Sequence, residues 1–165
     1  MKLIIGIDPG KSGGLAYMLI DGKHFLDIYA CKMPDDPCDI PEIIHHWSYE
    51  AQHVAGVQAV KRTVYMENPN GVPFRPKAQD DGKTRQGLAS TAKFNRNIGF
   101  IHGVLVGMDL SHTLISPMKW MNALQCRTGG DKRVTRNLAI KMFPDLKVTH
   151  ATADALLICH YGSLQ

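Results

Sequence analysis

The chain has 165 residues, of which 44% are hydrophobic and 21% are charged, and it carries a formal net charge of +4. This length and composition predict one domain, residues 1–165, with enough apolar side chains for a full core. The sequence contains no apolar run near the roughly 20 residues of a membrane span and no N-terminal secretion signal. Its four cysteines have neither CxxC nor zinc-ligand spacing. We therefore expect a reduced, cytoplasmic protein that does not engage a membrane.

The first third of the chain is expected to form three strands and a helix. The apolar residues 3–8 and 14–20 predict strands, and Asp21-Gly22 is typical of a hairpin turn that leads into a third strand at 25–31. Several prolines then interrupt the pattern. Asp39 can cap a helix, because the apolar residues after it keep helical spacing.

The middle of the chain predicts a strand, a long loop and a long helix. Residues 63–67 form the strand, and Asn68-Pro69-Asn70-Gly71 stops it. Residues 69–84 show no periodicity, and a loop of this length in a compact domain is usually functional or mobile. The long helix is expected over residues 85–108.

Two faces of this long helix suit close packing. One is an apolar seam with steps of three and four residues, suited to packing on another helix. The other is a row of small residues that permits close approach, either within the chain or against a second subunit. The seam consists of Phe94, Ile98, Ile101, Leu105 and Met108, and the second face of Gly99, Gly103 and Gly107.

A fifth strand and two helices are predicted next. Residues 113–116 form the strand, Ser116-Pro117 begins a helix, and Gly129-Gly130 ends it. Asp131 caps the following helix, which Pro144 ends. Its inward-facing residues are expected to be Val134, Leu138 and Met142.

The last helix completes a recognisable order of elements. Thr149 or Thr152 opens it, and it runs to about Tyr161. Three antiparallel strands followed by alternating helices and strands predict an α/β fold with a five-stranded mixed sheet flanked by helices. No repeat and no second domain is apparent.

Three acidic residues occupy unusually apolar surroundings. Asp8 ends the first strand, Glu67 ends the fourth, and Asp154 lies within the last helix. Brought together, the three carboxylates would repel one another, and divalent metal ions are the simplest compensation. Two metal ions held in this way suit phosphodiester cleavage. His150 lies four residues before Asp154, hence on the same helical face, and could ligate metal or move a proton.

Each of these residues has a simpler alternative role. Asp8 could shape the turn before Pro9-Gly10, and Glu67 could be a surface acid at a strand end. Asp154 could be a first-turn helix charge and His150 a residue of the capping region. The segment from Gly6 to Ser12 is not a phosphate-binding loop, because three residues instead of four separate its glycines.

Basic residues gather in two stretches, 75–96 and 119–141, where acidic residues are few. Such stretches suit a polyanion such as nucleic acid, although a solvated basic surface is the alternative. The predicted DNA-contacting residues are Lys11, Arg75, Lys77, Lys83, Arg85, Lys93, Arg96, Lys119, Lys132, Arg133 and Arg136.

Three motifs carry a resemblance to a known family. IIGIDPGKSGGLAY, VYMENP and HATADALLICHYG, in this order, resemble the RuvC family of Holliday junction resolvases, especially its phage-borne members, within the ribonuclease H-like superfamily. The resemblance spans nearly the whole chain. It implies a homodimeric endonuclease of a bacterial or phage-infected cell that uses Mg²⁺ or Mn²⁺, two ions per active site. Such enzymes bind four-way DNA junctions and nick two opposed strands symmetrically.

The resemblance also implies roles for individual residues. Asp8, Glu67 and Asp154 fall on the family's metal-binding acids. The family usually has a fourth acidic or histidine ligand about one turn before the last acid. Bacterial members have an acid three residues before it, where this chain has Ala151, and His150 lies four residues before it, so His150 is the candidate and the identity of the fourth ligand stays open. Lys119 and Lys132 resemble the family lysines that contact DNA or support catalysis, and residues 85–108 correspond to its dimer helix.

The loop after Glu67 is longer and more basic than in bacterial members. We hypothesise that residues 69–96 touch the junction, with Phe74 as a stacking wedge at its centre. A basic tether without such contacts is the alternative. Two other functions stay open: a ribonuclease H-like nuclease acting on other branched DNA or on RNA-containing substrates, and a junction-binding protein that does not cleave.

Overall fold

A mixed five-stranded sheet forms the centre of the computed structural model, which describes residues 1–68 and 88–165. The strand order is β3-β2-β1-β4-β5. The first three strands are antiparallel neighbours, and the last two run parallel to β1. The strands are β1 (Lys2–Asp8), β2 (Gly14–Asp21), β3 (His24–Lys32), β4 (Lys61–Glu67) and β5 (His112–Ile115).

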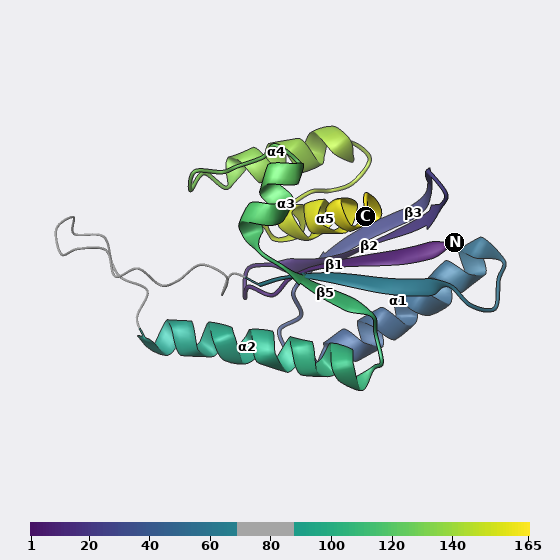
Figure 1. Cartoon of the computed structure of the whole chain (residues 1–165), viewed down its shortest axis with the longest axis horizontal. Coiled ribbons are helices and arrows are strands. Elements are labelled where there is room, and N and C mark those ends of the chain that lie inside the picture. Colours follow the sequence, from purple (N-terminus) through teal and green to yellow (C-terminus); the bar gives the residue numbers. More distant parts are fainter. Residues whose placement is uncertain (69–87) are drawn as a thin grey trace.

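Helices cover both faces of the sheet (Figure 1). One face carries α1 (Ile40–Ala55), preceded by a 3-10 turn at Pro37–Asp39, and α2 (Leu88–Gly107). The other face carries α3 (Pro117–Ala123), α4 (Arg133–Met142) and α5 (His150–Ser163). The predicted α/β fold, with its antiparallel first three strands, is confirmed. Among the described helices, none has both the length and the apolarity needed to cross a bilayer.

The side chains of the central strand β1 point alternately into the two hydrophobic cores, one on each face of the sheet. Leu3, Ile5 and Ile7 point to the side of α1 and α2, whereas Ile4 points to the side of α5. A strand buried on both faces reads as a continuous apolar run, which is why this segment is recognisable in the sequence.

The position of α5 depends on a glycine in β1. A Cβ atom added at Gly6 would lie 2.5 Å from the backbone nitrogen of Cys159, inside α5. Only a residue without a side chain therefore allows the helix to lie this close to the strand. Thr149 caps α5 by accepting a hydrogen bond from the backbone N–H of Thr152, so the first of the two predicted starts is the correct one.

The apolar seam of α2 packs within the chain. Ile98, Ile101 and Leu105 are buried in a core that α2 shares with the sheet and with α1, so the seam meets both a helix and the sheet. Helix α2 lies beneath the sheet on the same side as α1 (Figure 1), and the sheet and α1 together provide the apolar surface. The glycine face points away from the core, since a Cβ atom at Gly99 or Gly103 would meet nothing within 4 Å.

Two boundaries and one face differ from expectation on the side of α3 and α4. Helix α3 ends at Ala123, several residues before Gly129-Gly130. Helix α4 has Lys132 and not Asp131 at its N-cap position, although the Asp131 carboxylate accepts a hydrogen bond from the Arg133 N–H at 2.9 Å. In α4 the fully buried positions are Thr135 and Ala139, and Val134 is 37% exposed. The inward prediction for Val134 is wrong, because the short side chains of Thr135 and Ala139 let α4 pack closely on α5 instead.

Candidate active site

The carboxyl ends of β1 and β4 place two acidic residues side by side. The two strands are parallel neighbours with Ile7 opposite Met66, so Asp8 and Glu67 leave the sheet at adjacent positions. Asp154 approaches from the first turns of α5, which packs on β1. Strand ends and a packed helix are rigid supports, and rigid supports hold catalytic groups in a defined geometry.

The three acids line one cavity of about 800 Å³. The walls come from the loop after β1, the segment after β3, the first turns of α2, and the region around α3 and α4. The lining residues are Asp8, Gly10, Lys11, Ser12, Met33, Pro34, Asp35, Pro37, Glu67, Lys93, Phe94, Asn97, Pro117, Met121, Thr128, Lys132 and Asp154.

The loop after β1 folds back onto Asp8. The backbone N–H of Gly10 donates to Asp8 Oδ1 at 3.1 Å, and Gly13 N–H donates to the Gly10 carbonyl at 2.8 Å. A Cβ atom at Gly13 would stand 2.6 Å from the Asp8 carboxyl carbon, so a side chain there would displace the acid. Asn97 of α2 donates to the Pro9 carbonyl at 2.7 Å and ties this loop to the helix. Asp8 thus shapes the turn and lines the cavity at once.

Glu67 is oriented by a fully buried tryptophan. The indole N–H of Trp120, on α3, donates to Glu67 Oε2 at 2.7 Å. Burial and the neighbouring Asp8 carboxylate raise the pKa of Glu67 to about 7, although the Trp120 hydrogen bond and the Lys132 ammonium act in the opposite direction. Near neutral pH this carboxyl is therefore poised between its two protonation states.

The other two acids are also short of compensating partners. Burial is the main cause that raises the pKa of Asp8, and the nearby Asp154 carboxylate adds to it. Asp154 Oδ1 is buried and has no hydrogen-bond partner among the described residues. A buried carboxylate oxygen without a donor is costly, and a cation is the group that would satisfy it.

The donor set fits a hard divalent cation. Carboxylate oxygens are the ligands that Mg²⁺ and Mn²⁺ prefer, and Lys132 is the cation whose charge lowers the pKa of both Asp8 and Glu67. Within residues 1–68 and 88–165 no three His, Cys, Asp or Glu side chains already stand in metal-binding geometry. The carboxylates thus share a cavity and an electrostatic field, and binding of an ion would draw them closer together.

The predicted lysines and His150 fall in different places. Lys132, Lys11 and Lys93 line the cavity. Lys119 and His150 are exposed and are not among its lining residues, so their catalytic and ligand roles stay predictions.

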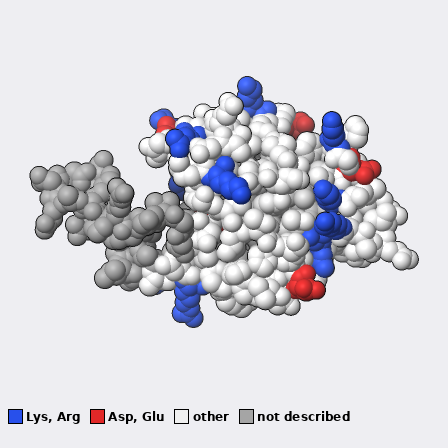
Figure 2. Space-filling model, viewed as in Figure 1, with Lys and Arg blue, Asp and Glu red and all other residues white. Residues whose placement is uncertain are grey.

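The remaining predicted DNA-contacting residues either do not line the cavity or lie outside the described part of the chain. Arg96 and Arg133 are exposed and Arg136 is partly buried, and Arg133 is paired with Asp131 at 2.9 Å. On the face seen in Figure 2, Lys and Arg side chains are spread over the surface. Phe74, Arg75, Lys77, Lys83 and Arg85 lie outside the described residues.

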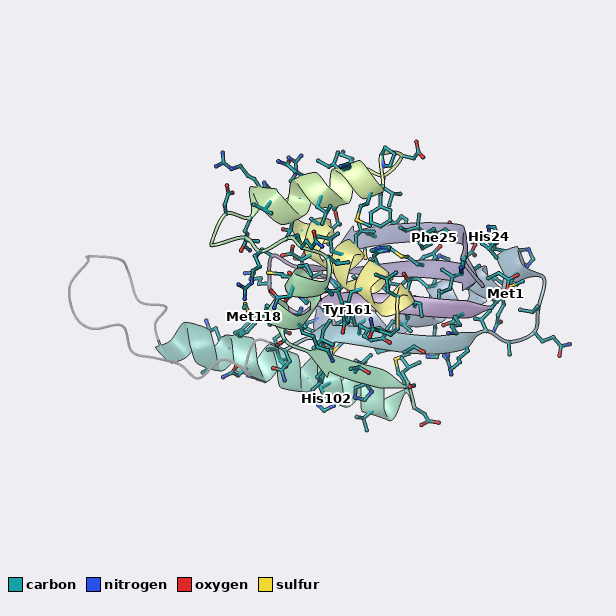
Figure 3. The ribbon with its side chains drawn as sticks, turned by 45° about the horizontal axis from the view of Figure 1, so that its top comes forward. Met1, His24, Phe25, His102, Met118 and Tyr161 are labelled. Carbon is teal, nitrogen blue, oxygen red and sulfur yellow. The ribbon has the colours of Figure 1, made fainter. Side chains whose placement is uncertain are left out.

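Three residues of the site have no counterpart in the sequence-based prediction. Trp120 orients Glu67, Asn97 holds the loop after Asp8, and Phe94 of the predicted α2 seam also lines the cavity. No spacing pattern identifies Trp120 or Asn97, because each acts across elements distant in sequence. Figure 3 shows Met118 of α3 far from the end of the molecule where Met1, His24 and Phe25 gather.

Comparisons with known proteins agree with this fold. No family model and no curated protein matches the sequence. Among solved structures, Thermus thermophilus RuvC superposes with a TM-score of 0.52 and 20% identity, covering 98% of this chain and 93% of that one. The T. thermophilus RuvC in complex with a Holliday junction substrate superposes with a TM-score of 0.52 and 18% identity, over 98% of this chain and 92% of that one. The chain therefore has a RuvC-like fold of the ribonuclease H type.

Proposed function

We propose that this protein is a metal-dependent endonuclease that resolves four-way DNA junctions by nicking two opposed strands. The observation that carries the proposal is the convergence of Asp8, Glu67 and Asp154 in one cavity beside Lys132. The fold adds support, because one structural neighbour is a RuvC in complex with a Holliday junction substrate.

The acids would hold two Mg²⁺ or Mn²⁺ ions. When bound, such ions activate a water molecule and stabilise the leaving oxygen of the phosphodiester. Trp120 keeps the Glu67 carboxylate turned toward the cavity, and the Gly10 N–H fixes the Asp8 carboxylate. Lys132, which lines the cavity, would contact the phosphate, and His150 at the start of α5 is proposed as the fourth ligand.

Two opposed nicks require two active sites, so we also propose a homodimer. The outer face of α2 supports it, because Gly99, Gly103 and Gly107 leave open space along a helix that also exposes Phe100 and Val106. Open glycines on a helix permit close approach of a second copy. Gly103→Leu should shift the protein toward monomer in sedimentation velocity, whereas the surface change Asp145→Asn should not. A wild type that is monomeric at micromolar concentration would contradict the proposed dimer.

DNA binding would rest on Lys11, Lys93 and Lys132 at the cavity, with Lys119, Arg96 and Arg136 around it. Affinity should fall steeply with salt, because each neutralised phosphate releases counterions. An affinity that hardly changes between low and moderate salt would contradict this arrangement.

The decisive experiment is nicking of a synthetic mobile four-way junction in Mg²⁺ and in Mn²⁺, with Asp8→Asn in parallel. We expect symmetric nicks by the wild type, and junction binding without nicking by the variant. Three-way, flap and RNA-containing substrates in the same panel distinguish a junction resolvase from a broader nuclease. A wild type that binds junctions but nicks nothing with either metal would identify a binding protein instead.

A further inference from the structure

A second hollow lies on the face of the sheet that carries α1. It has a volume of about 570 Å³ and shares no lining residue with the acidic cavity. Strands β2 and β3 form its floor and α1 its wall, and we call it the α1–β3 groove. Its lining residues are Tyr17, Tyr29, Cys31, Glu42, Ile43, His46, Trp47 and Glu50.

Three aromatic rings form the base of the α1–β3 groove. Trp47 packs against Tyr17 with ring centroids 5.1 Å apart and against Tyr29 at 6.1 Å. Tyr17 and Trp47 are almost fully buried, whereas Tyr29 is 51% exposed. Asp27 accepts a hydrogen bond from the Tyr17 hydroxyl and so fixes that ring. A rigid aromatic pair thus supports a third ring that is half open to solvent.

The charge around these rings is negative. Glu42 and Glu50 lie two turns apart on α1, and Asp27 lies across from them on β3. Helix α1 contains no Lys or Arg, although the chain as a whole has a net charge of +4. A nucleic acid would be repelled here. A cation would be attracted by the carboxylates and by the aromatic faces together.

The free edge of the sheet beside the groove can orient an extended ligand. Strand β3 is the outermost strand and pairs only with β2 among the described strands, so its other edge offers backbone donors and acceptors. An extended segment can pair with such an edge while its alternate side chains enter the neighbouring hollow.

We propose that the α1–β3 groove binds an arginine side chain presented by a basic, extended segment of a partner protein. The flat guanidinium stacks on the half-exposed ring of Tyr29, which rests on Trp47, and the Glu42 and Glu50 carboxylates accept its N–H groups. Arginine fits better than lysine, because its planar, weakly hydrated cation stacks on aromatic rings and donates to carboxylates in one geometry. The proposal does not depend on nuclease activity.

The probe is a short peptide that alternates arginine and valine, titrated into ¹⁵N-labelled protein. The chain has two tryptophans, and comparison with Trp120→Phe assigns the indole signal of Trp47. We expect that signal and the β3 amides to shift with the arginine peptide and to stay still with a citrulline peptide, which keeps the shape and removes the charge.

Matched variants test the two parts of the groove. Glu42→Gln combined with Glu50→Gln should weaken peptide binding roughly tenfold. Asp145→Asn, which neutralises an exposed acid elsewhere, should not weaken it. Tyr29→Phe should retain binding and Tyr29→Leu should lose it. Junction nicking should be unchanged in all of these variants.

Three outcomes would overturn the proposal. One is an unshifted Trp47 signal at millimolar arginine peptide, and another is equal binding of the citrulline peptide. The third is a Trp47 signal that shifts on dilution without peptide, because the groove would then be covered by a second copy of the chain.

Discussion

The acidic cavity and the α1–β3 groove both carry carboxylates, but they hold them in opposite ways. In the cavity the acids are buried, the pKa of Glu67 rises to about 7, and Asp154 Oδ1 has no partner within the described residues. In the groove, Glu42 is exposed beside aromatic rings. Buried carboxylates short of donors require a compact divalent charge. Exposed carboxylates around rings suit a diffuse organic cation. The same charge therefore selects different ligands according to its solvation.

The largest expected effect separates the two sites by activity. Asp154→Asn should lower junction nicking by about 10³-fold or more, because a metal ligand contributes several kcal/mol to the transition state. Glu50→Gln should leave nicking unchanged. Single-turnover nicking at saturating protein measures both, and an unchanged melting temperature of Asp154→Asn shows that the fold is intact. If Asp154→Asn still nicks junctions, Asp154 is not a metal ligand of the active site.

The next effect concerns the helix that carries Asp154. Gly6→Ala should destabilise the protein by about 2–4 kcal/mol, because its Cβ atom would run into the α5 backbone. Gly103→Ala is the matched control, since the space around it is open and alanine favours a helix by roughly 0.5–1 kcal/mol. Urea unfolding of both variants measures the difference. Equal stabilities would mean that α5 does not depend on this close approach.

A weaker effect is expected at the residue that orients Glu67. Trp120→Phe keeps an aromatic ring but removes the donor to Glu67 Oε2, and should reduce metal affinity by about 10–100-fold. Trp47→Phe, in the groove, should leave it unchanged. Mn²⁺ binding followed by paramagnetic broadening measures affinity apart from activity. Equal Mn²⁺ affinity in wild type and Trp120→Phe would show that Trp120 only fills the core.

The elements that position the acids were predictable because each shows a pattern that is local in the sequence. Residues 3–7 form an apolar run that Asp8 closes, as expected of a strand covered on both faces. The parallel pairing of β1 and β4 places Asp8 beside Glu67. The capping box at Thr149 fixes the start of α5 and hence the turn on which Asp154 lies.

The features that sequence reasoning missed depend on contacts between distant elements. Steps of three and four residues show that Ile98 and Ile101 share a face, but not that the sheet and α1 of the same chain cover it. The Trp120 hydrogen bond to Glu67 joins residues 53 positions apart. The α1–β3 groove likewise exists only because Trp47 folds against Tyr17.

The smallest effect is a pH dependence that belongs to the acidic cavity. Folding raises the pKa of Glu67 from 4.5 to about 7, so the folded state binds the extra proton and the unfolded state does not. Stability without metal should therefore fall as pH rises from about 4.5 to 7, by on the order of 1–3 kcal/mol from this group. Glu67→Gln removes the cost of ionisation, while its amide oxygen can still accept from Trp120.

Metal should reverse this trend, because a bound ion replaces the proton. We expect Mg²⁺ to stabilise the wild type at pH 8 and to lose that effect below about pH 7, since protons then compete for Glu67. Chemical unfolding of the wild type and Glu67→Gln at pH 5 and pH 8, with and without Mg²⁺, measures both trends. If the two proteins respond identically, Glu67 is not the group that links protons to metal, and the buried Asp8 becomes the group to examine.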